Sequence, residues 1–215
     1  MKIRFTLVPD GPTDAALVPV IEWTLKQTGA VDLAEGKTAE FWRLRQKPAN
    51  LKERLIRAVE LFPCDIPFVH RDAEKEEPAV RRAEILRAFD ETREKTQLPV
   101  VAVIPIRMLE AWLCFNEKAI REAAGNPNGE VLLDLPPLNQ IETRPDPKSD
   151  LARALLDASE LKGRRRKKFD GLKAFWRIVD FIDDFSALRN LDGFCKFEES
   201  IRTVRDNGWQ PGFYG

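Results

Sequence analysis

The chain contains a single histidine, His70, among its 215 residues. A zinc site built from several histidines, or a metalloprotease helix that carries two of them, is therefore excluded. The sequence also lacks the patterns GxxxxGK[ST], GxGxxG and GxSxG, which mark phosphate loops, dinucleotide sites and serine nucleophiles. His70-Arg71-Asp72 is similar to a kinase catalytic loop, but Glu77 stands where that loop needs asparagine. These absences disfavour nucleotide hydrolysis, serine hydrolase chemistry and kinase activity.

Cysteine and long apolar runs are scarce as well. Cys64, Cys114 and Cys195 are widely spaced and odd in number, which indicates buried reduced thiols and excludes a disulfide framework. No stretch approaches 18 apolar residues, and the N-terminus has no apolar leader segment, so we expect a soluble, cytoplasmic protein with no membrane partner. Thirty-five basic residues balance thirty-five acidic ones, so no global field points to nucleic acid.

The residues that are present predict an α/β fold with a mostly parallel sheet flanked by helices. Apolar, β-branched runs at 2–8, 66–69 and 98–106 predict strands, and a weaker strand is expected at 39–44. Helical apolar spacing falls between these runs, and this alternation of strands with helices is typical of parallel sheets. The expected helices open at Thr13 and cover 49–62, 76–96, 148–160, 171–184 and 192–206.

The same pattern predicts three parts. An α/β core is expected over 1–124, followed by an irregular excursion or linker at 125–147 that is rich in Pro, Asn and Gly. A helical C-terminal part packed on the core is expected over 148–215. In the helix at 76–96, we expect the inner face to consist of Ala79, Ala83, Leu86 and Phe89.

Acidic residues follow three of the apolar runs where each predicted strand ends: Asp10, then Asp72 with Glu74, then Glu110. Because the carboxyl ends of parallel strands meet at one edge of a sheet, we expect these side chains to form a carboxylate cluster there. Asp72 and Glu74 are two residues apart, so an extended backbone projects both to the same side. Asp14, one turn into the first helix, is a further candidate ligand.

Oxygen-only ligation favours Mg²⁺ or Mn²⁺ over zinc or copper, and such ions activate water or polarise phosphoryl groups. Each acid also has a structural explanation, because carboxylates cap helix N-termini and are favoured there by the helix dipole. His70, next to an apolar strand, is expected to be a buried histidine that supports the site and not a catalytic base. The sequence therefore leaves two interpretations open, a metal site and a set of capping acids.

The segment 162–168 carries six basic residues in seven, interrupted only by Gly163. Such a run can neutralise phosphates without reading sequence, which predicts nucleic-acid contacts by Arg164, Arg165, Arg166, Lys167 and Lys168. The alternative is a solvated loop or helix end with no ligand. The aromatic residues are spaced like core positions, and we expect them to be buried: Trp23, Trp42, Trp112, Phe175 and Trp176.

At these residues the sequence resembles the Toprim domain, the module shared by topoisomerases, primases and nucleases of the OLD (overcoming lysogenisation defect) group. More closely, it resembles a family of small bacterial Toprim-like proteins often encoded beside ABC-type or SMC-like ATPases in antiphage defence loci. The resemblance covers most of the first 150 residues. It rests on the segments 8–14, 71–74, 105–113 and 146–148, which read VPDGPTD, RDAE, PIRMLEAWL and DPK.

The resemblance implies a Toprim/Rossmann-like fold and a magnesium-dependent nuclease with a DNA substrate and an ATPase partner. Asp72 and Glu74 would hold metal, Asp10 would bind metal or relay a proton, and Asp14 with Glu110 would complete the metal shell. Lys148 would contact phosphate. Toprim enzymes usually carry Glu at the first position and Asp at the end of the acid-x-acid pair, whereas this chain has Asp10 and Glu74. Two alternatives stay open, a non-catalytic subunit that docks on an ATPase and a metal-dependent phosphatase acting on small molecules.

Overall fold

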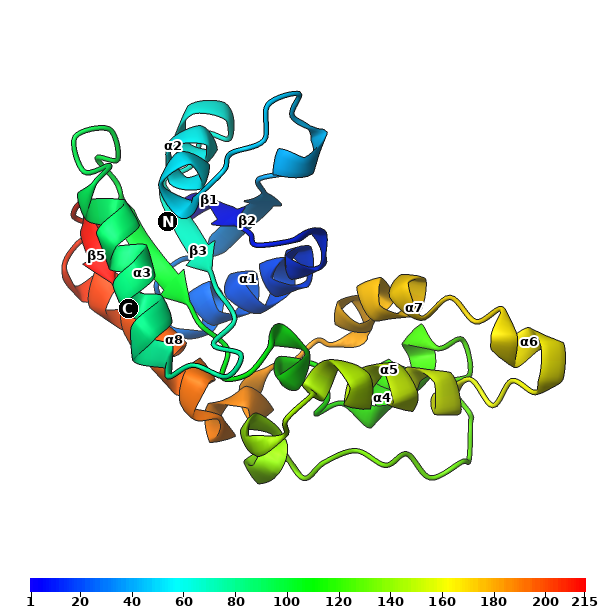
Figure 1. Cartoon of the computed structure of the whole chain (residues 1–215). Helices are drawn as coiled ribbons and strands as arrows, with labels where there is room; N and C mark the ends of the chain where they lie inside the picture. Colours follow the sequence, from blue (N-terminus) through cyan, green and yellow to red (C-terminus); the bar gives the residue numbers. More distant parts are fainter. The chain divides into compact units, whose positions relative to one another are not determined.

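A computed structural model describes residues 1–215 and divides into two compact units (Figure 1). The first unit comprises Met1–Pro105 together with Asp192–Gly215, and the second comprises Ile106–Leu191. These boundaries differ from the expected division at 124 and 148. The reason is that the last helix and the last strand return to the sheet of the first unit, so the C-terminal part is shared between the units.

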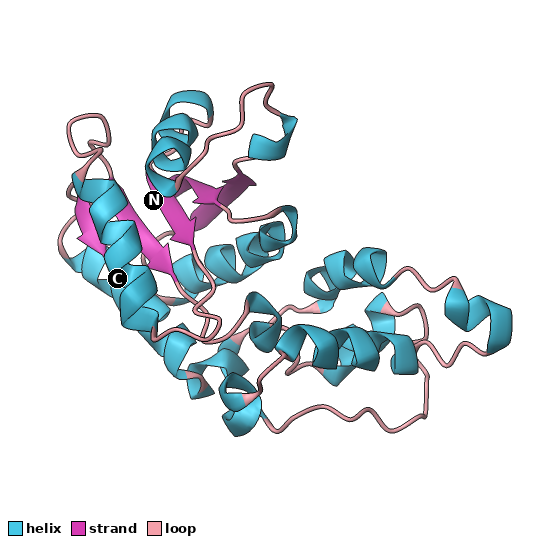
Figure 2. Ribbon diagram, viewed as in Figure 1, coloured by secondary structure: helices cyan, strands magenta, loops and turns pink.

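The first unit is built on a five-stranded sheet in the order β2-β1-β3-β4-β5, and every neighbouring pair is parallel. The expected α/β class is therefore confirmed, and the arrangement is that of a doubly wound, Rossmann-like sheet. The chain runs outward from β1 to β2 and then continues on the other side of β1 with β3. The order thus reverses between β1 and β3. Figure 2 shows the strands, whose bounds are Lys2–Val8, Leu33–Thr38, Ile66–His70, Pro99–Val103 and Gly212–Tyr214 for β1 to β5.

Helices cover both faces of this sheet. α1 packs on β2 and contacts α8, which packs on β4 and β5, so these two helices share one face. α2 packs on β1 and β3, contacts α3, and shares the opposite face with it. The bounds are Leu17–Gln27 for α1, Leu51–Leu61 for α2, Pro78–Asp90 for α3 and Asp192–Asp206 for α8, and the 3₁₀ helices η1 and η2 cover Pro12–Ala16 and Phe41–Arg43.

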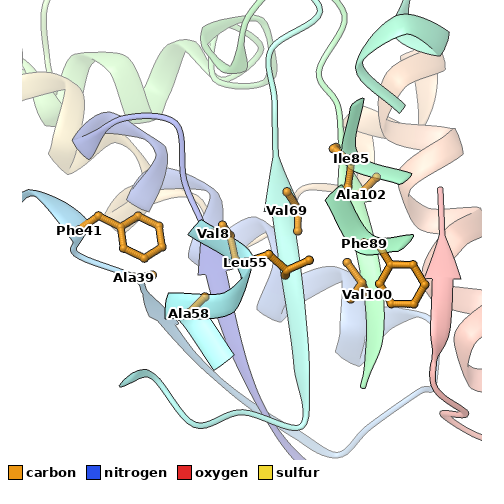
Figure 3. Close-up of a cluster of buried hydrophobic side chains, with 10 residues drawn as sticks. All are labelled: Val8, Ala39, Phe41, Leu55, Ala58, Val69, Ile85, Phe89, Val100 and Ala102. Atoms are coloured by element: carbon orange, nitrogen blue, oxygen red, sulfur yellow. The ribbon is translucent and has the colours of Figure 1, made fainter. Parts of the chain in front are cut away.

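A separate apolar layer lies on each face of the sheet. Toward α2 and α3, Val8, Val69 and Val100 meet Leu55 and Phe89 in a buried cluster (Figure 3). Alternate strand residues point to the other face. There Phe68 packs edge-on against Phe5 of β1, with ring centroids 5.2 Å apart, and against Phe197 of α8 at 6.0 Å. This alternation fixes which face each later side chain reaches.

The prediction of a weak strand at 39–44 is wrong. The strand β2 lies six residues earlier, and the segment 41–43 is the 3₁₀ helix η2. The strand LAEGKT is at the sheet edge and has little apolar alternation, whereas Phe41 is buried for another reason, its contact with the α2 face. Gly36 pairs with Phe5, and a Cβ at this position would lie 2.2 Å from the Phe5 ring. Glycine is thus required for this part of β2 to pack.

The expected inner face of the helix at 76–96 is also corrected. α3 is shorter, and Ala79 and Ala83 are exposed, while Ile85, Ala88 and Phe89 are buried. Phe89 is buried as expected, but Ile85 and Ala88 complete the buried stripe in place of Ala79, Ala83 and Leu86, so the inner face is rotated. That rotation turns Arg81 and Glu84, both partly buried, toward the edge where β3 ends.

The second unit is helical and contains no strand. Its helices α4, α5 and α7 contact one another pairwise and enclose buried residues such as Ile120, Leu151 and Ile178. The expected excursion at 125–147 has no regular structure up to η4. The bounds are Glu117–Ala123 for α4, Pro147–Ala158 for α5, Gly163–Lys167 for α6 and Gly171–Ile178 for α7, with η3, η4, η5 and η6 at Leu109–Trp112, Leu138–Thr143, Val179–Phe181 and Ser186–Asn190.

The three cysteines are free. Cys114 is buried and Cys64 partly buried, as expected for core thiols, whereas Cys195 is exposed on α8. None of the helices is both long enough and apolar enough to cross a bilayer.

Candidate functional site at the carboxyl ends of β1 and β3

The turn after β1 is held by Asp14. The 3₁₀ helix η1 begins with Pro12, and Asp14 at its third position folds back over the turn. Its Oδ2 accepts hydrogen bonds from the backbone amides of Asp10 at 2.7 Å and Gly11 at 3.0 Å. Asp14 is 4% exposed, and its carboxylate therefore fixes the backbone from which Asp10 projects into solvent.

His70, the last residue of β3, links two of the predicted acids. Its Nδ1 lies 2.9 Å from Asp14 Oδ2 and its Nε2 lies 3.1 Å from Asp72 Oδ1, and its side chain is completely buried. With a carboxylate at each ring nitrogen, both nitrogens act as donors, so the ring is an imidazolium. His70 thus bridges the turn after β1 and the segment after β3.

The electrostatics of this bridge follow from its geometry. Burial lowers the pKa of His70, but the hydrogen bonds and charges of Asp14 and Asp72 outweigh burial and raise it to about 10. Burial likewise raises the pKa of Asp14, but His70 and the amides of Gly11 and Asp10 outweigh burial and leave it below its usual range. Both groups are therefore charged at neutral pH.

Asp10 is paired with two arginines. Its Oδ1 accepts from Nη1 of Arg54, on α2, and from Nη1 of Arg71, both at 2.7 Å. Arg71 also pairs through Nη2 with Glu84 of α3 at 3.2 Å. Its Nε is buried without a hydrogen-bond partner.

Arg81 extends these contacts to Glu74. Its Nη1 donates to Glu84 at 2.9 Å, its Nη2 to Glu74 at 3.2 Å and its Nε to the backbone oxygen of Asp72 at 3.0 Å. Together with the pairs of Asp10, the contacts place three carboxylates among three guanidiniums. This set of six side chains, termed the arginine network below, consists of Asp10, Arg54, Arg71, Glu74, Arg81 and Glu84.

Asp10 and Asp72 share one edge of the sheet but belong to different faces. Val8 pairs with Val69, and both belong to the apolar layer beneath α2 and α3. Asp10, two residues after Val8, contacts Arg54 of α2 on that face. Asp72 contacts His70, which is two residues after Phe68 and therefore lies on the opposite face of the sheet, toward α8. Accordingly, no group of three or more His, Cys, Asp or Glu side chains is arranged to hold a metal ion.

The segment after β3 stays extended and then turns sharply. The backbone amides of Arg71 and Ala73 donate to Val103 and Pro105, so the parallel ladder with the β4 segment continues beyond the strands. Glu74 then adopts a left-handed conformation with φ of 56°, which is unusual for a residue with a side chain. This turn takes Glu74 out of the alternation that would place it beside Asp72 and brings it to Arg81.

The arginines of this site were not predicted from the sequence. A partial signal exists, because Arg54 and Arg81 each occupy the fourth position of a helix, where the positive end of the helix dipole disfavours a cation. Such a placement indicates a nearby acid. Arg71 lies inside the RDAE segment, but nothing in the sequence shows that its side chain reaches Asp10.

The remaining predicted residues belong to the second unit. Glu110 is buried in η3 and stays a predicted ligand. Asp146 caps α5 by accepting from the amide of Ser149 at 2.9 Å, and Lys148 is exposed in the first turn of that helix. The basic run forms the short helix α6, which has no buried residue, and Arg166 pairs with Asp157 at 2.8 Å.

Three cavities lie in the first unit, and one of them, of about 410 Å³ beside the C-terminal end of α3, contains none of the predicted acids. Another of about 160 Å³ adjoins Asp10 and Arg54. The largest, of about 550 Å³, lies between α3, β4, β5 and α8 and includes Arg82, Lys196 and Tyr214 in its lining. The largest cavity also contains none of the predicted acids. The carboxyl ends of β1 and β3, where the chain order reverses, are therefore the candidate site, as expected for doubly wound sheets.

No family model, no curated protein and no solved structure matches this chain, so its function is inferred from the site itself.

Proposed function

We propose that the protein is a metal-dependent nuclease that cleaves phosphodiester bonds in nucleic acid, with Asp10, Asp72 and Glu74 as its catalytic residues. The observation that supports the proposal is that Asp10 and Asp72 follow β1 and β3, the two strands between which the sheet order reverses. Ligands of open α/β sheets bind outside the carboxyl ends of the strands at such a point. The exposure of Asp10 and Glu74 makes them accessible there.

The donor chemistry of these residues fits Mg²⁺ or Mn²⁺, because all the donors are carboxylate oxygens. Asp10, Asp72 and Glu74 form no metal-binding group in their present conformation, so they would hold the ion only after leaving their present partners. When bound, the ion supplies a polarised phosphoryl oxygen or an activated water. Asp14 positions Asp10 through the turn amides, and His70 positions Asp72. Because Asp10 and Glu74 are paired with arginines, metal binding would compete with those ion pairs.

The arginine network also suits a phosphate substrate. Guanidinium groups bind phosphate oxygens through two parallel hydrogen bonds, and Arg54 and Arg71 are both partly accessible beside Asp10.

The proposal includes DNA as the substrate, phosphate contacts by Lys148 and the basic run 162–168, and an ABC- or SMC-type ATPase as the partner. The full exposure of α6 removes one ground for the small-molecule phosphatase, which a buried basic run would have favoured.

A second function is favoured by a specific observation. Each proposed catalytic carboxylate already has a cationic partner: Asp10 has Arg54 and Arg71, Asp72 has His70, and Glu74 has Arg81. A site satisfied by its own side chains suits a non-catalytic subunit that docks on an ATPase. The two functions differ in whether metal displaces these pairs.

Nicking of supercoiled plasmid distinguishes them. We expect the wild-type protein to nick DNA with Mg²⁺ or Mn²⁺, alone or together with an ABC- or SMC-type ATPase, and Glu74→Gln to lose most of this activity. Glu76→Gln is the matched control, because Glu76 is exposed two residues further along the same loop and outside the arginine network. If the wild type never exceeds Glu74→Gln under any of these conditions, the nuclease proposal fails and the regulatory subunit replaces it.

A further inference from the structure

The cavity of about 160 Å³ beside Asp10 is lined mainly by rigid or aromatic residues. One wall is the turn Pro9-Asp10-Gly11-Pro12 after β1, and the other is formed by Phe41 and Trp42 of η2, Lys47 and Pro48 of the following loop, and Arg54 of α2. Arg54 joins the two sets of lining residues, because its Nη1 donates to the Pro9 carbonyl at 3.1 Å and to Asp10 at 2.7 Å. The cavity is thus a built feature of the candidate site.

Trp42 differs from Trp23, Trp112 and Trp176. Trp112 is completely buried, and Trp23 and Trp176, although only partly buried, contact Phe194 and Phe175 with ring centroids 6.4 and 6.0 Å apart. Trp42 is only partly buried, makes no ring contact and donates no hydrogen bond, although its neighbour Phe41 is buried against the α2 face. The expectation that all these aromatics are buried holds for Trp112 and Phe175, whereas Trp23, Trp42 and Trp176 are only partly buried. Of these three, Trp42 is the one that lines a cavity.

The charges around the ring indicate an anion. Lys47 is exposed and forms no ion pair, and Arg54 presents a guanidinium that is one-quarter exposed. An aromatic face next to two cations is the combination that binds nucleotides, because the base stacks on the ring and the phosphate pairs with the cations. Asp10 at the rim would then lie beside the phosphodiester of the bound nucleotide.

The size of the cavity limits the ligand to one ring system. Its volume of about 160 Å³ is smaller than the pockets of about 300–1,000 Å³ that hold drug-sized molecules. A base paired within a duplex cannot present its face to such a pocket without leaving the stack. An unpaired base therefore suits the cavity better than a paired one.

We propose that the cavity beside Asp10 binds one unpaired nucleotide of a single-stranded nucleic acid, with its base on Trp42 and its phosphate on Lys47 and Arg54. This inference rests on the proposed nuclease function and deepens it, because it assigns single-stranded segments as the substrate class. Stacking of one base on an aromatic side chain contributes about 1–3 kcal/mol, which corresponds to roughly 5- to 150-fold in affinity.

The test measures binding of a fluorescent oligo-dT to the full chain in EDTA, so that cleavage plays no part. We expect Trp42→Ala to weaken binding at least fivefold, Trp42→Phe to retain most of it, and Lys47→Gln to weaken it and flatten its salt dependence. Trp176→Ala is the matched control, since Trp176 is also partly buried but belongs to the other unit. A duplex of the same length and dTMP alone should each bind at least tenfold more weakly than oligo-dT.

A second readout covers the case in which Trp42→Ala does not fold. Oligo-dT should quench the tryptophan emission of the wild type, and Trp42→Phe, a smaller aromatic change, should remove most of that quenching. Equal quenching in both proteins, unchanged affinity of folded Trp42→Ala, or equal affinity for duplex or dTMP would overturn the inference. Because these assays contain no metal, a nuclease without Trp42-dependent binding defeats only this inference. Trp42-dependent binding without any cleavage defeats only the nuclease proposal.

Discussion

The acidic residues after β1 and β3 and the basic run of α6 are both charged segments, but they are built differently. The acids are tied by hydrogen bonds to buried or partly buried partners from β3, α2 and α3. The basic run forms a five-residue helix with no buried residue and one surface ion pair, Arg166 with Asp157. Charge alone does not identify a site, and the difference lies in how many elements converge on the charged groups.

The contrast predicts that the largest effect on stability comes from His70. His70→Gln should lower the free energy of unfolding by about 3–5 kcal/mol, because it leaves the buried carboxylate of Asp14 without its cationic partner. Urea unfolding followed by circular dichroism measures the change. Arg165→Ala, on exposed α6, should change the stability by less than about 0.5 kcal/mol. Equal losses in the two variants would show that the bridge and the basic run do not differ in this way.

The pH dependence of stability sharpens the same comparison. The pKa of His70 is raised in the folded protein from its ordinary 6.5 to about 10, so the stabilisation is fully present below pH 6.5 and declines as the pH rises toward 10. Between these values, one extra proton is bound in the folded state, and the free energy of unfolding should fall by about 1.4 kcal/mol per pH unit.

Measurements from pH 6.5 to 8.5 test this slope. Above that range, deprotonation of Cys64 and Cys114, whose pKa values burial raises, contributes with the same sign. His70→Gln should flatten the slope, whereas Arg165→Ala should leave it unchanged. A wild-type protein as stable at pH 8.5 as at pH 6.5 would contradict a charged His70.

At the acidic end, the lowered pKa of Asp14 gives stabilisation that is present above the ordinary pKa of an aspartate and is lost as the pH falls below it.

Most of the fold could be predicted from the sequence because long periodic segments determine it. The helix expected at 192–206 has those bounds as α8, and the helix expected to open at Thr13 is present as η1 and α1, in which Leu17, Ile21 and Leu25 are buried. The strand β5 was missed because three residues, GFY, give no period to detect. The edge strand β2 was misplaced because burial of Phe41 in a 3₁₀ helix gives the same apolar signal as a strand residue.

The candidate site was predictable only in part. A strand end can be read from the sequence, so the position of Asp10 and Asp72 at one edge could be anticipated. The face that each side chain reaches depends on the register of β1 against β3, in which Val8 pairs with Val69. This register is a property of the paired strands, so it cannot be read from either segment alone. The guanidiniums of Arg54 and Arg81 come from two other helices, so their contacts required the tertiary structure.

A smaller effect is expected from metal ions. If Mg²⁺ or Mn²⁺ displaces the arginines from Asp10 and Glu74, a concentration of ten times the dissociation constant should stabilise the fold by about 1.4 kcal/mol. Thermal unfolding measures this shift, and Asp72→Asn should remove most of it. Glu76→Gln should keep it, since Glu76 lies outside the arginine network. An Asp72→Asn protein with the full shift would exclude Asp72 as a main ligand.

The smallest effect on stability is expected from the basic run, where the consequence should instead appear in binding. Replacing Arg164, Arg165 and Arg166 by Ala should change the free energy of unfolding by no more than about 1 kcal/mol, because the one ion pair lost lies at the surface.

If α6 contacts phosphates, the same variant should weaken binding to all DNA sequences alike. The slope of log affinity against log salt should decrease by about 1 to 3, because each phosphate contact contributes about 0.9. Lys118→Ala, an exposed cation on α4 outside the run, is the control and should leave the slope unchanged. An unchanged slope in the triple variant would show that α6 is a solvated helix without phosphate contacts, and the proposed site would then be confined to the edge of the sheet.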